Sequence, residues 1–181
     1  MRVLGVVCGP HRMGNTALLV RRVLEGAEEK GYETELICLS DLQISPLSEG
    51  PGGLYEVSFP KDDMEKVYRA LERMDVLVLG TPIYYDHVSA RTKIFIDRLY
   101  YYNHPDAKKR FPRNGRAVLV ITYEWDNPEA YDGVLEWLKR TLEHYWKLRV
   151  VATLKAEGTT KRPVAEREDL LERAKAIGLN L

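Results

Sequence analysis

The sequence is short of cysteine, has no excess of charge of either sign and contains no long hydrophobic run. Its two cysteines, Cys8 and Cys38, are too few for a disulfide scaffold, and 45% hydrophobic with 30% charged residues excludes a disordered or collagen-like chain. The 27 Lys and Arg residues balance 27 Asp and Glu residues, so the charge indicates no nucleic-acid partner. No stretch approaches the about 20 apolar residues that a membrane span needs, so we expect no membrane partner.

The N-terminal sequence MRVLGVVCGP contains a short apolar run, but Gly and Pro interrupt it before it reaches the length of a signal-peptide core. We therefore expect a cytoplasmic protein in which both cysteines are free, buried thiols, with oxidation of Cys8 as the alternative because it lies near a ligand loop. The length predicts a single domain over residues 1–181, since a domain usually has roughly 100–200 residues.

Strand-like apolar runs alternate with segments in which apolar residues recur at helical spacing. Continuous runs of Val, Ile and Leu, each followed by a helix, are typical of a parallel sheet with both faces covered. The sequence thus predicts an α/β fold, a doubly wound five-stranded parallel sheet of order 2-1-3-4-5 with helices on both faces. The predicted strands are residues 2–8, 34–39, 76–79, 117–122 and 150–154, and the predicted helices lie around 20–27, 64–71, 90–102, 134–145 and 170–177.

In that strand order, ligands bind beyond the carboxyl ends of the first and third strands. The loop after the first strand, GPHRMGNT at residues 9–16, opens a helix, where free backbone N–H groups favour an anion such as a phosphate. The loop lacks the Gly-Lys-Ser/Thr ending of a P-loop and the spacing of GxGxxG, so nucleoside triphosphate and dinucleotide sites are disfavoured. A plain strand-to-helix turn, capped by Asn15 or Thr16, is the alternative.

The loop after the third strand, TPIYYDHVSARTKIFIDRL from residue 81, has a stiff Pro82 followed by Tyr84 and Tyr85, against which a planar ligand could rest. Together the two loops resemble the flavodoxin-like FMN-binding family that includes NAD(P)H-dependent FMN reductases and iron–sulfur flavoproteins. The segments ISPL, DDM and KAEGTTKRPVAEREDLLERAKAIG add to the resemblance, which therefore spans nearly the whole chain.

The resemblance implies an FMN site with a phosphate end and a ring end. The phosphate would be held in the first loop, and the isoalloxazine ring would lie along the second loop, largely against backbone groups. Lys93 and the Asp97–Arg98 pair match the helix that follows this loop in the family, where we expect them to be structural or subunit-contact residues, with a solvated face as the alternative. The predicted cofactor-binding residues are Pro10, His11, Arg12, Gly14, Asn15, Thr16, Pro82, Ile83, Tyr84, Tyr85, His87, Tyr123 and Trp125.

The sequence departs from the family pattern at two places. Leu47, Gly50 and Gly53 stand about where iron–sulfur members carry three cluster cysteines, so we expect no iron–sulfur cluster. Asp86 and His87 replace small or polar residues: Asp86 could repel an electron-rich reduced flavin, whereas His87 either donates to it or simply faces solvent.

Three further segments have alternative interpretations. The tyrosines at 100–102 suit a subunit interface or plain surface, whereas Tyr123 and Trp125 suit the third ligand loop or an interface. The basic segment 104–116 either attracts nicotinamide-cofactor phosphates or is a solvated connection. The connection from 41 to 62 is too long for a plain loop and is a candidate functional or assembly arm.

The expected activity is that of an FMN-dependent oxidoreductase, which transfers hydride from NADH or NADPH through FMN to a small acceptor such as a quinone, a flavin, a nitro compound or a metal ion. No side-chain acid or base is predicted, because the flavin carries the chemistry. A flavodoxin-type electron carrier, which the balanced charge disfavours, and a non-catalytic flavin-binding protein are the alternatives. The resemblance also implies a homodimer or homotetramer.

Overall fold

The computed structural model describes residues 1–181, except for the side chains of residues 53–55. The strands are β1 (Arg2–Val7), β2 (Glu33–Cys38), β3 (Ser48–Gly50), β4 (Gly53–Ser58), β5 (Val76–Tyr84), β6 (His87–Val88), β7 (Arg116–Thr122) and β8 (Arg149–Ala156). The α-helices are α1 (Asn15–Glu29), α2 (Met64–Leu71), α3 (Ala90–Arg98), α4 (Pro105–Lys108), α5 (Asp132–Trp146) and α6 (Glu168–Leu179). Short 3₁₀ turns are η1 (Leu39–Asp41), η2 (Leu99–Asn103) and η3 (Val164–Glu166).

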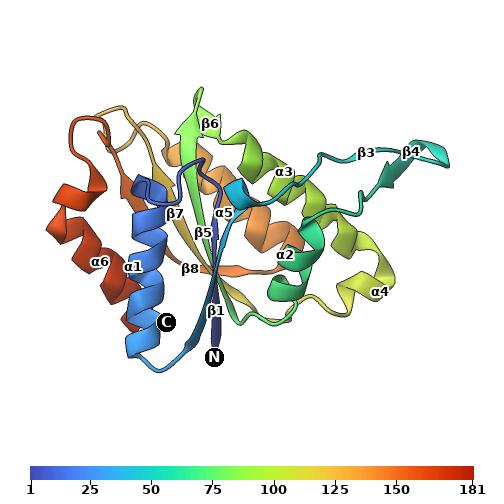
Figure 1. Ribbon diagram of the computed structural model, residues 1–181, viewed down its shortest axis with the longest axis horizontal. Coiled ribbons are helices and arrows are strands. Elements are labelled where there is room, and N and C mark those ends of the chain that lie inside the picture. The colour runs from blue at the N-terminus through green and yellow to red at the C-terminus, as the bar shows by residue number, and fades with distance from the viewer.

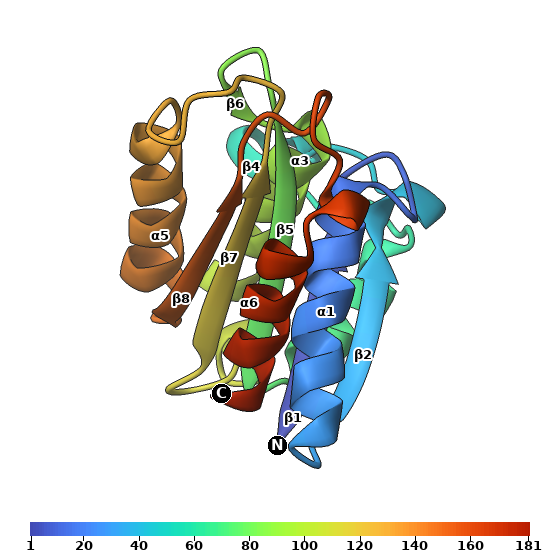
Figure 2. The same cartoon turned by 90° about the vertical axis from the view of Figure 1, so that its left-hand side faces the viewer.

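The main sheet has the order β2-β1-β5-β7-β8, and each of these pairings is parallel. This confirms the predicted order 2-1-3-4-5. Helices α1 and α6 cover one face, and α2, α3 and α5 cover the other (Figures 1 and 2). The loops at the carboxyl ends of the strands lie at the end of the molecule opposite both termini (Figure 2).

The central strands are buried on both faces, which is why their sequences are continuous apolar runs. In β5, Leu77 and Leu79 point into the core beneath α2, α3 and α5, whereas Val76 and Val78 point into the core beneath α1 and α6. This alternation follows from the two-residue period of a strand. In the described part of the chain, no helix is long and apolar enough to cross a membrane.

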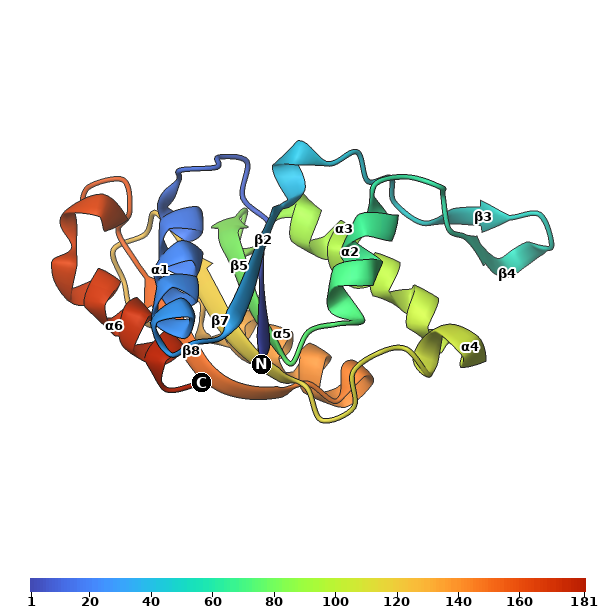
Figure 3. The same cartoon turned by 60° about the horizontal axis from the view of Figure 1, so that its bottom comes forward.

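The connection at 41–62 carries an antiparallel hairpin, β3–β4, that projects beyond the body of the molecule (Figures 1 and 3). Both ends of this arm are fastened by Arg98, whose side chain is 1% exposed. Its guanidinium donates to both carboxylate oxygens of Asp62 at 2.7 and 3.0 Å, and to the carbonyls of Ser45 (2.8 Å) and Pro60 (3.1 Å). A solvated face is therefore wrong for Arg98, although it describes the exposed Lys93–Asp97 pair (2.6 Å).

The predicted helix at 90–102 ends as an α-helix at Arg98 and continues as a 3₁₀ turn to Asn103. The Arg98 carbonyl accepts the Tyr68 hydroxyl at 2.7 Å, and the next tyrosines pack on the same ring. Tyr101 stacks on Tyr68 with ring centroids 4.4 Å apart. Tyr102 is only 3% exposed, so surface or interface was the wrong prediction for this residue, because its ring completes the core.

Candidate functional site

A cavity of about 220 Å³ lies where β1, β5 and β7 end. The first loop forms one wall with Gly9, Pro10 and His11, and the start of α1 forms the floor. We call this cavity the phosphate pole. Its lining residues are Gly9, Pro10, His11, Gly14, Asn15, Thr16, Pro82, Ile83, Tyr84, Thr122, Tyr123, Glu124, Thr159 and Thr160.

The phosphate pole is suited to an anion because the first N–H groups of α1 have no intrahelical partner. The first turn of α1 carries no acidic residue, and no side chain caps it, so the alternative of a turn capped by Asn15 or Thr16 is wrong. Asn15 instead accepts the Val164 N–H through Oδ1 at 2.9 Å, which ties α1 to η3. The Thr16 and Thr122 hydroxyls are 2.6 Å apart and buried, so the floor is rigid.

A second cavity of about 810 Å³ continues from the first along Ile83, Tyr84 and Tyr123. We call it the ring pole, because five of its eleven lining residues are aromatic. Its volume is within the usual range for ligand pockets, roughly 300–1,000 Å³. The lining residues are Ile83, Tyr84, Tyr85, Asp86, Tyr123, Glu124, Trp125, Asp126, Tyr131, Thr160 and Lys161.

The outer wall of the ring pole is a two-residue turn between β5 and β6. Tyr84 pairs with His87, and the two residues between them, Tyr85 and Asp86, have φ values of 46° and 62°. Such left-handed conformations favour Gly or Asn, so a tyrosine there is strained. The Tyr131 hydroxyl donates to Asp86 Oδ1 at 2.9 Å and holds the turn against the start of α5. Tyr85 is left fully exposed at the tip.

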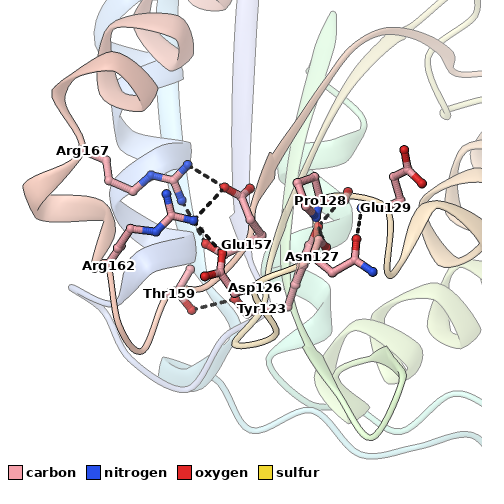
Figure 4. Close-up of polar contacts among 9 residues, drawn as sticks. All are labelled: Tyr123, Asp126, Asn127, Pro128, Glu129, Glu157, Thr159, Arg162 and Arg167. Atoms are coloured by element: carbon pink, nitrogen blue, oxygen red, sulfur yellow. Dashed lines mark hydrogen bonds and ion pairs between the residues drawn. The ribbon is translucent and has the colours of Figure 1, made fainter.

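Two loops close the opposite side of the crevice and are joined by hydrogen bonds (Figure 4). Arg162 donates to Asp126 at 2.7 Å, and Arg167 donates to the Glu157 carboxylate at 3.0 Å. The Tyr123 carbonyl accepts both the N–H and the hydroxyl of Thr159, at 3.0 and 3.1 Å. The loop after β8 is therefore held by hydrogen bonds against the loop that contains Tyr123 and Trp125, and the two loops form one wall of the crevice.

Tyr123 is buried, and burial raises its pKa to about 12. Its hydroxyl donates to the carbonyls of Asn127 and Pro128, at 3.3 and 3.1 Å, so it is occupied in holding the loop. Tyr123 thus shapes the crevice and is unsuited to donating a proton.

The structure brings all the predicted cofactor-binding residues to these two cavities except Arg12 and His87. Arg12 is exposed and donates to Asp41 at 2.6 Å, away from the phosphate pole. His87 is exposed, and its ring packs edge-on against Trp137 of α5 with centroids 4.7 Å apart. The His87 placement agrees with the solvent-facing alternative.

Several lining residues were not predicted from the sequence: Thr122, Glu124, Tyr131, Thr159, Thr160 and Lys161. The loop after the last strand contributes three of them, because the carboxyl end of β8 lies at the same edge of the sheet as those of β1 and β5. These three residues could have been predicted from the rule that ligands bind at the carboxyl ends of the strands, applied to the last strand as well.

The other candidate groups do not line the crevice. The basic segment 104–116 precedes the amino end of β7, at the opposite edge of the sheet, and its Arg110 donates to Glu72 at 2.9 Å. Cys8 and Cys38 are free and buried, and burial raises the pKa of Cys8 to about 12. Among the described side chains, no group of three His, Cys, Asp or Glu residues is arranged to hold a metal ion.

The sheet order and the crevice at the carboxyl ends of β1 and β5 define a flavodoxin-like α/β protein. The family described as NADPH-dependent FMN reductase matches residues 1–130, more than half of the chain, which therefore belongs to this family.

Curated relatives and solved structures agree with this assignment. An iron–sulfur flavoprotein of Methanocaldococcus jannaschii is 36% identical over 99 residues, which are 54% of this chain and 51% of the relative. One of Archaeoglobus fulgidus is 31% identical over 123 residues, 66% of this chain and 54% of the relative. The chain thus spans about half the length of these relatives. The structure of NAD(P)H:quinone oxidoreductase from Methanothermobacter marburgensis superposes with a TM-score of 0.73 at 18% identity, covering 99% of this chain and 95% of that chain, and shows the same fold.

Proposed function

We propose that the chain is an FMN-dependent oxidoreductase that takes hydride from NADH or NADPH and passes the electrons to a small acceptor. One observation carries the proposal. A cavity that ends on the N-terminus of α1, whose first turn carries no acidic residue, continues directly into a larger cavity lined by five aromatic side chains. A molecule with an anionic tail and a flat head fits this arrangement, and FMN is such a molecule.

When bound, FMN supplies reversible two-electron chemistry at its ring. In the proposed complex, the N–H groups at the start of α1 hold the phosphate, and the Asn15 amide can add a donor because only its oxygen is engaged with Val164. The ring lies against the segment from Pro82 to Tyr85. Neither Tyr123 nor any other side chain is assigned an acid or base role.

The open side of the ring pole is where nicotinamide and acceptor would bind in turn. Tyr84, Tyr85 and Trp125 are 48%, 103% and 59% exposed, so their rings can contact a second flat molecule. Acceptors of this shape include quinones, flavins and nitroaromatic compounds, and a metal ion is the fourth class we include. If nicotinamide and acceptor occupy the same open side of the ring pole one after the other, the enzyme should follow ping-pong kinetics.

The test is anaerobic stopped-flow mixing of FMN-loaded protein with NADH or NADPH. Bleaching of the flavin at a rate that saturates with the nicotinamide, followed by reoxidation with a quinone, supports the reductase. Flavin that stays oxidised with both nicotinamides but accepts electrons from dithionite would favour a flavodoxin-type carrier. Turnover with no member of an acceptor panel would favour a non-catalytic flavin-binding protein.

We also propose that the protein holds no iron–sulfur cluster, in contrast to the names of its curated relatives. Its only cysteines, Cys8 and Cys38, are buried at the ends of β1 and β2, whereas a cluster normally needs four thiolates. Iron and acid-labile sulfide assays on protein purified under nitrogen test this. Stoichiometric iron and sulfide would contradict it.

The proposed assembly is a cytoplasmic homodimer or homotetramer in which the β3–β4 arm contacts a second copy. An isolated two-stranded hairpin is marginally stable in water, so the projecting arm needs a partner surface. Light scattering should show an oligomer, and replacing residues 47–58 with a short Gly-Ser linker should reduce it to monomers. An arm-deleted protein with the same oligomeric state as the wild type would contradict this role.

A further inference from the structure

Pro82 interrupts the hydrogen-bond ladder between β1 and β5. Val7 lies opposite Gly80, and the Cys8 N–H donates to the Gly80 carbonyl at 2.8 Å. In a parallel ladder, the Cys8 carbonyl would next accept the N–H of residue 82, but proline has no N–H group. The Cys8 carbonyl therefore needs a donor from elsewhere, because leaving a buried carbonyl unpaired is unfavourable.

Ser89 supplies that donor. Its hydroxyl lies 3.0 Å from the Cys8 carbonyl oxygen, although the two residues are 81 positions apart in the chain. Ser89 also caps α3, since its Oγ accepts the Thr92 N–H at 3.3 Å. One small side chain thus joins the end of β1 to the beginning of α3.

Two threonines extend this contact into a chain of hydroxyls. Thr92 Oγ1 lies 2.9 Å from Ser89 Oγ and 2.6 Å from Thr81 Oγ1. Ser89 is 4% exposed, and both threonines are fully buried. A carbonyl oxygen only accepts, so Ser89 donates to the Cys8 carbonyl and Thr81 donates to the Pro82 carbonyl. Thr92 lies between them and donates its single hydroxyl proton to one of the two. We call Thr81, Thr92 and Ser89 the hydroxyl relay.

The hydroxyl relay connects the two poles of the crevice. Its acceptor, Cys8, directly precedes Gly9 of the phosphate pole. At the other end, Thr81 directly precedes Pro82, and the Pro82 carbonyl accepts both the Thr81 hydroxyl at 2.9 Å and the Ser89 N–H at 3.2 Å. Each of the three hydroxyls and both carbonyls has a hydrogen-bond partner, so the network ties the two walls of the crevice together.

We propose that the hydroxyl relay is a positioning device that sets the distance between the phosphate pole and the ring pole. A ligand that engages both poles then gains affinity without having to order the crevice itself. The inference rests on the proposed function, since the ligand in question is FMN. The three hydroxyls do not line either cavity, so they act through the backbone that they hold.

Comparison of FMN with riboflavin tests the relay, because riboflavin has the ring but lacks the phosphate. We define the phosphate gain as the Kd of riboflavin divided by the Kd of FMN, each measured by flavin fluorescence titration of the apoprotein. In Thr92→Val, which keeps the shape but removes the hydroxyl, the phosphate gain should fall at least threefold. In Thr92→Ser, which keeps the hydroxyl, it should return towards the wild-type value.

The matched control is Thr141→Val. Thr141 is also buried and on a helix, but its hydroxyl donates to the Trp137 carbonyl within α5 at 2.7 Å, away from the crevice. A general loss of stability would weaken both flavins together and leave the phosphate gain unchanged. Hydrogen exchange of the apoprotein gives a second readout: the amides of residues 83–88 should exchange faster in Thr92→Val than in Thr141→Val.

The outcomes separate the relay from the proposed function. A wild-type protein that binds FMN, with a phosphate gain that Thr92→Val leaves unchanged, would overturn the relay and leave the oxidoreductase standing. A wild-type protein that binds neither flavin would overturn the proposed function itself. If Thr92→Val does not fold, Ser89→Ala is measured in the same way, and an unchanged phosphate gain in that variant would equally overturn the relay.

Discussion

The contact between α1 and α6 makes a quantitative prediction about Gly178. A Cβ atom at this position would lie 2.0 Å from the Val23 carbonyl oxygen and 2.7 Å from the Ala27 nitrogen, which are backbone atoms that cannot rotate away. Gly178→Ala must therefore push the two helices apart. Overpacking of this kind costs about 1–3 kcal/mol, and since the contact is with backbone on both helices we expect the upper half of that range.

The gain in helix propensity from Gly to Ala, about 1 kcal/mol, offsets part of this cost. The net loss in the free energy of unfolding is then about 1–2 kcal/mol, which lowers the Tm by about 2–8 °C in a protein of this size. The assay is thermal unfolding followed by circular dichroism, with urea denaturation as a check.

Gly133→Ala is the matched control. Gly133 lies in the first turn of α5, and a Cβ there would meet no atom within 4 Å. The same substitution should therefore leave the Tm unchanged or raise it slightly. A Gly178→Ala protein as stable as the wild type, or a Gly133→Ala protein that loses as much stability, would refute the close-packing argument.

Three further predictions concern the site, the arm and a helix end. Asn15→Asp should weaken FMN binding at least tenfold in fluorescence titrations by adding negative charge at the phosphate pole, while riboflavin binding changes little; equal weakening of both would contradict the assignment. Burial alone would raise the pKa of Asp62, but hydrogen bonds from Arg98 and from the N–H groups of Ser45 and Met64 outweigh it and lower that pKa. The ionised Asp62 therefore stabilises the protein fully above pH about 4, and this contribution disappears as the pH falls through the lowered pKa. In urea unfolding at pH 7, Asp62→Asn should be destabilised by about 3–5 kcal/mol. Below pH 4 this variant should lose less stability than the wild type does. A parallel pH dependence of the two proteins would count against the Arg98–Asp62 ion pair. Lys147 ends α5 with φ of 56°, so Lys147→Gly should raise the free energy of unfolding by about 1 kcal/mol, and a destabilised variant would show that the lysine side chain matters more than the backbone strain.

The sheet could be predicted from the sequence because the information is local. Runs such as residues 76–79 and 117–121 are apolar throughout, and such strands are typical of a parallel sheet that is covered on both faces, as in doubly wound folds. Most of the crevice followed from the same reasoning, since the ends of β1 and β5 locate it.

What the sequence did not predict depends on contacts between distant residues. The sequence predicts a structural or subunit-contact role for Arg98 but not its partner, because only the fold brings it to Asp62, 36 positions away. The family resemblance and its place in the first loop predict Arg12 as a phosphate ligand, but its guanidinium donates to Asp41 of η1 instead. The hydroxyl relay has the same origin: Pro82 removes a donor, and the serine that replaces it is recognisable only when β1 and α3 are adjacent in space.

The most direct test of the central claim is a crystal structure of the protein soaked with FMN. The account predicts the phosphate within hydrogen-bond distance of the N–H groups at the start of α1 and the ring lying along Pro82, Ile83 and Tyr84. An empty crevice at saturating FMN, or FMN bound with its phosphate elsewhere, would contradict it.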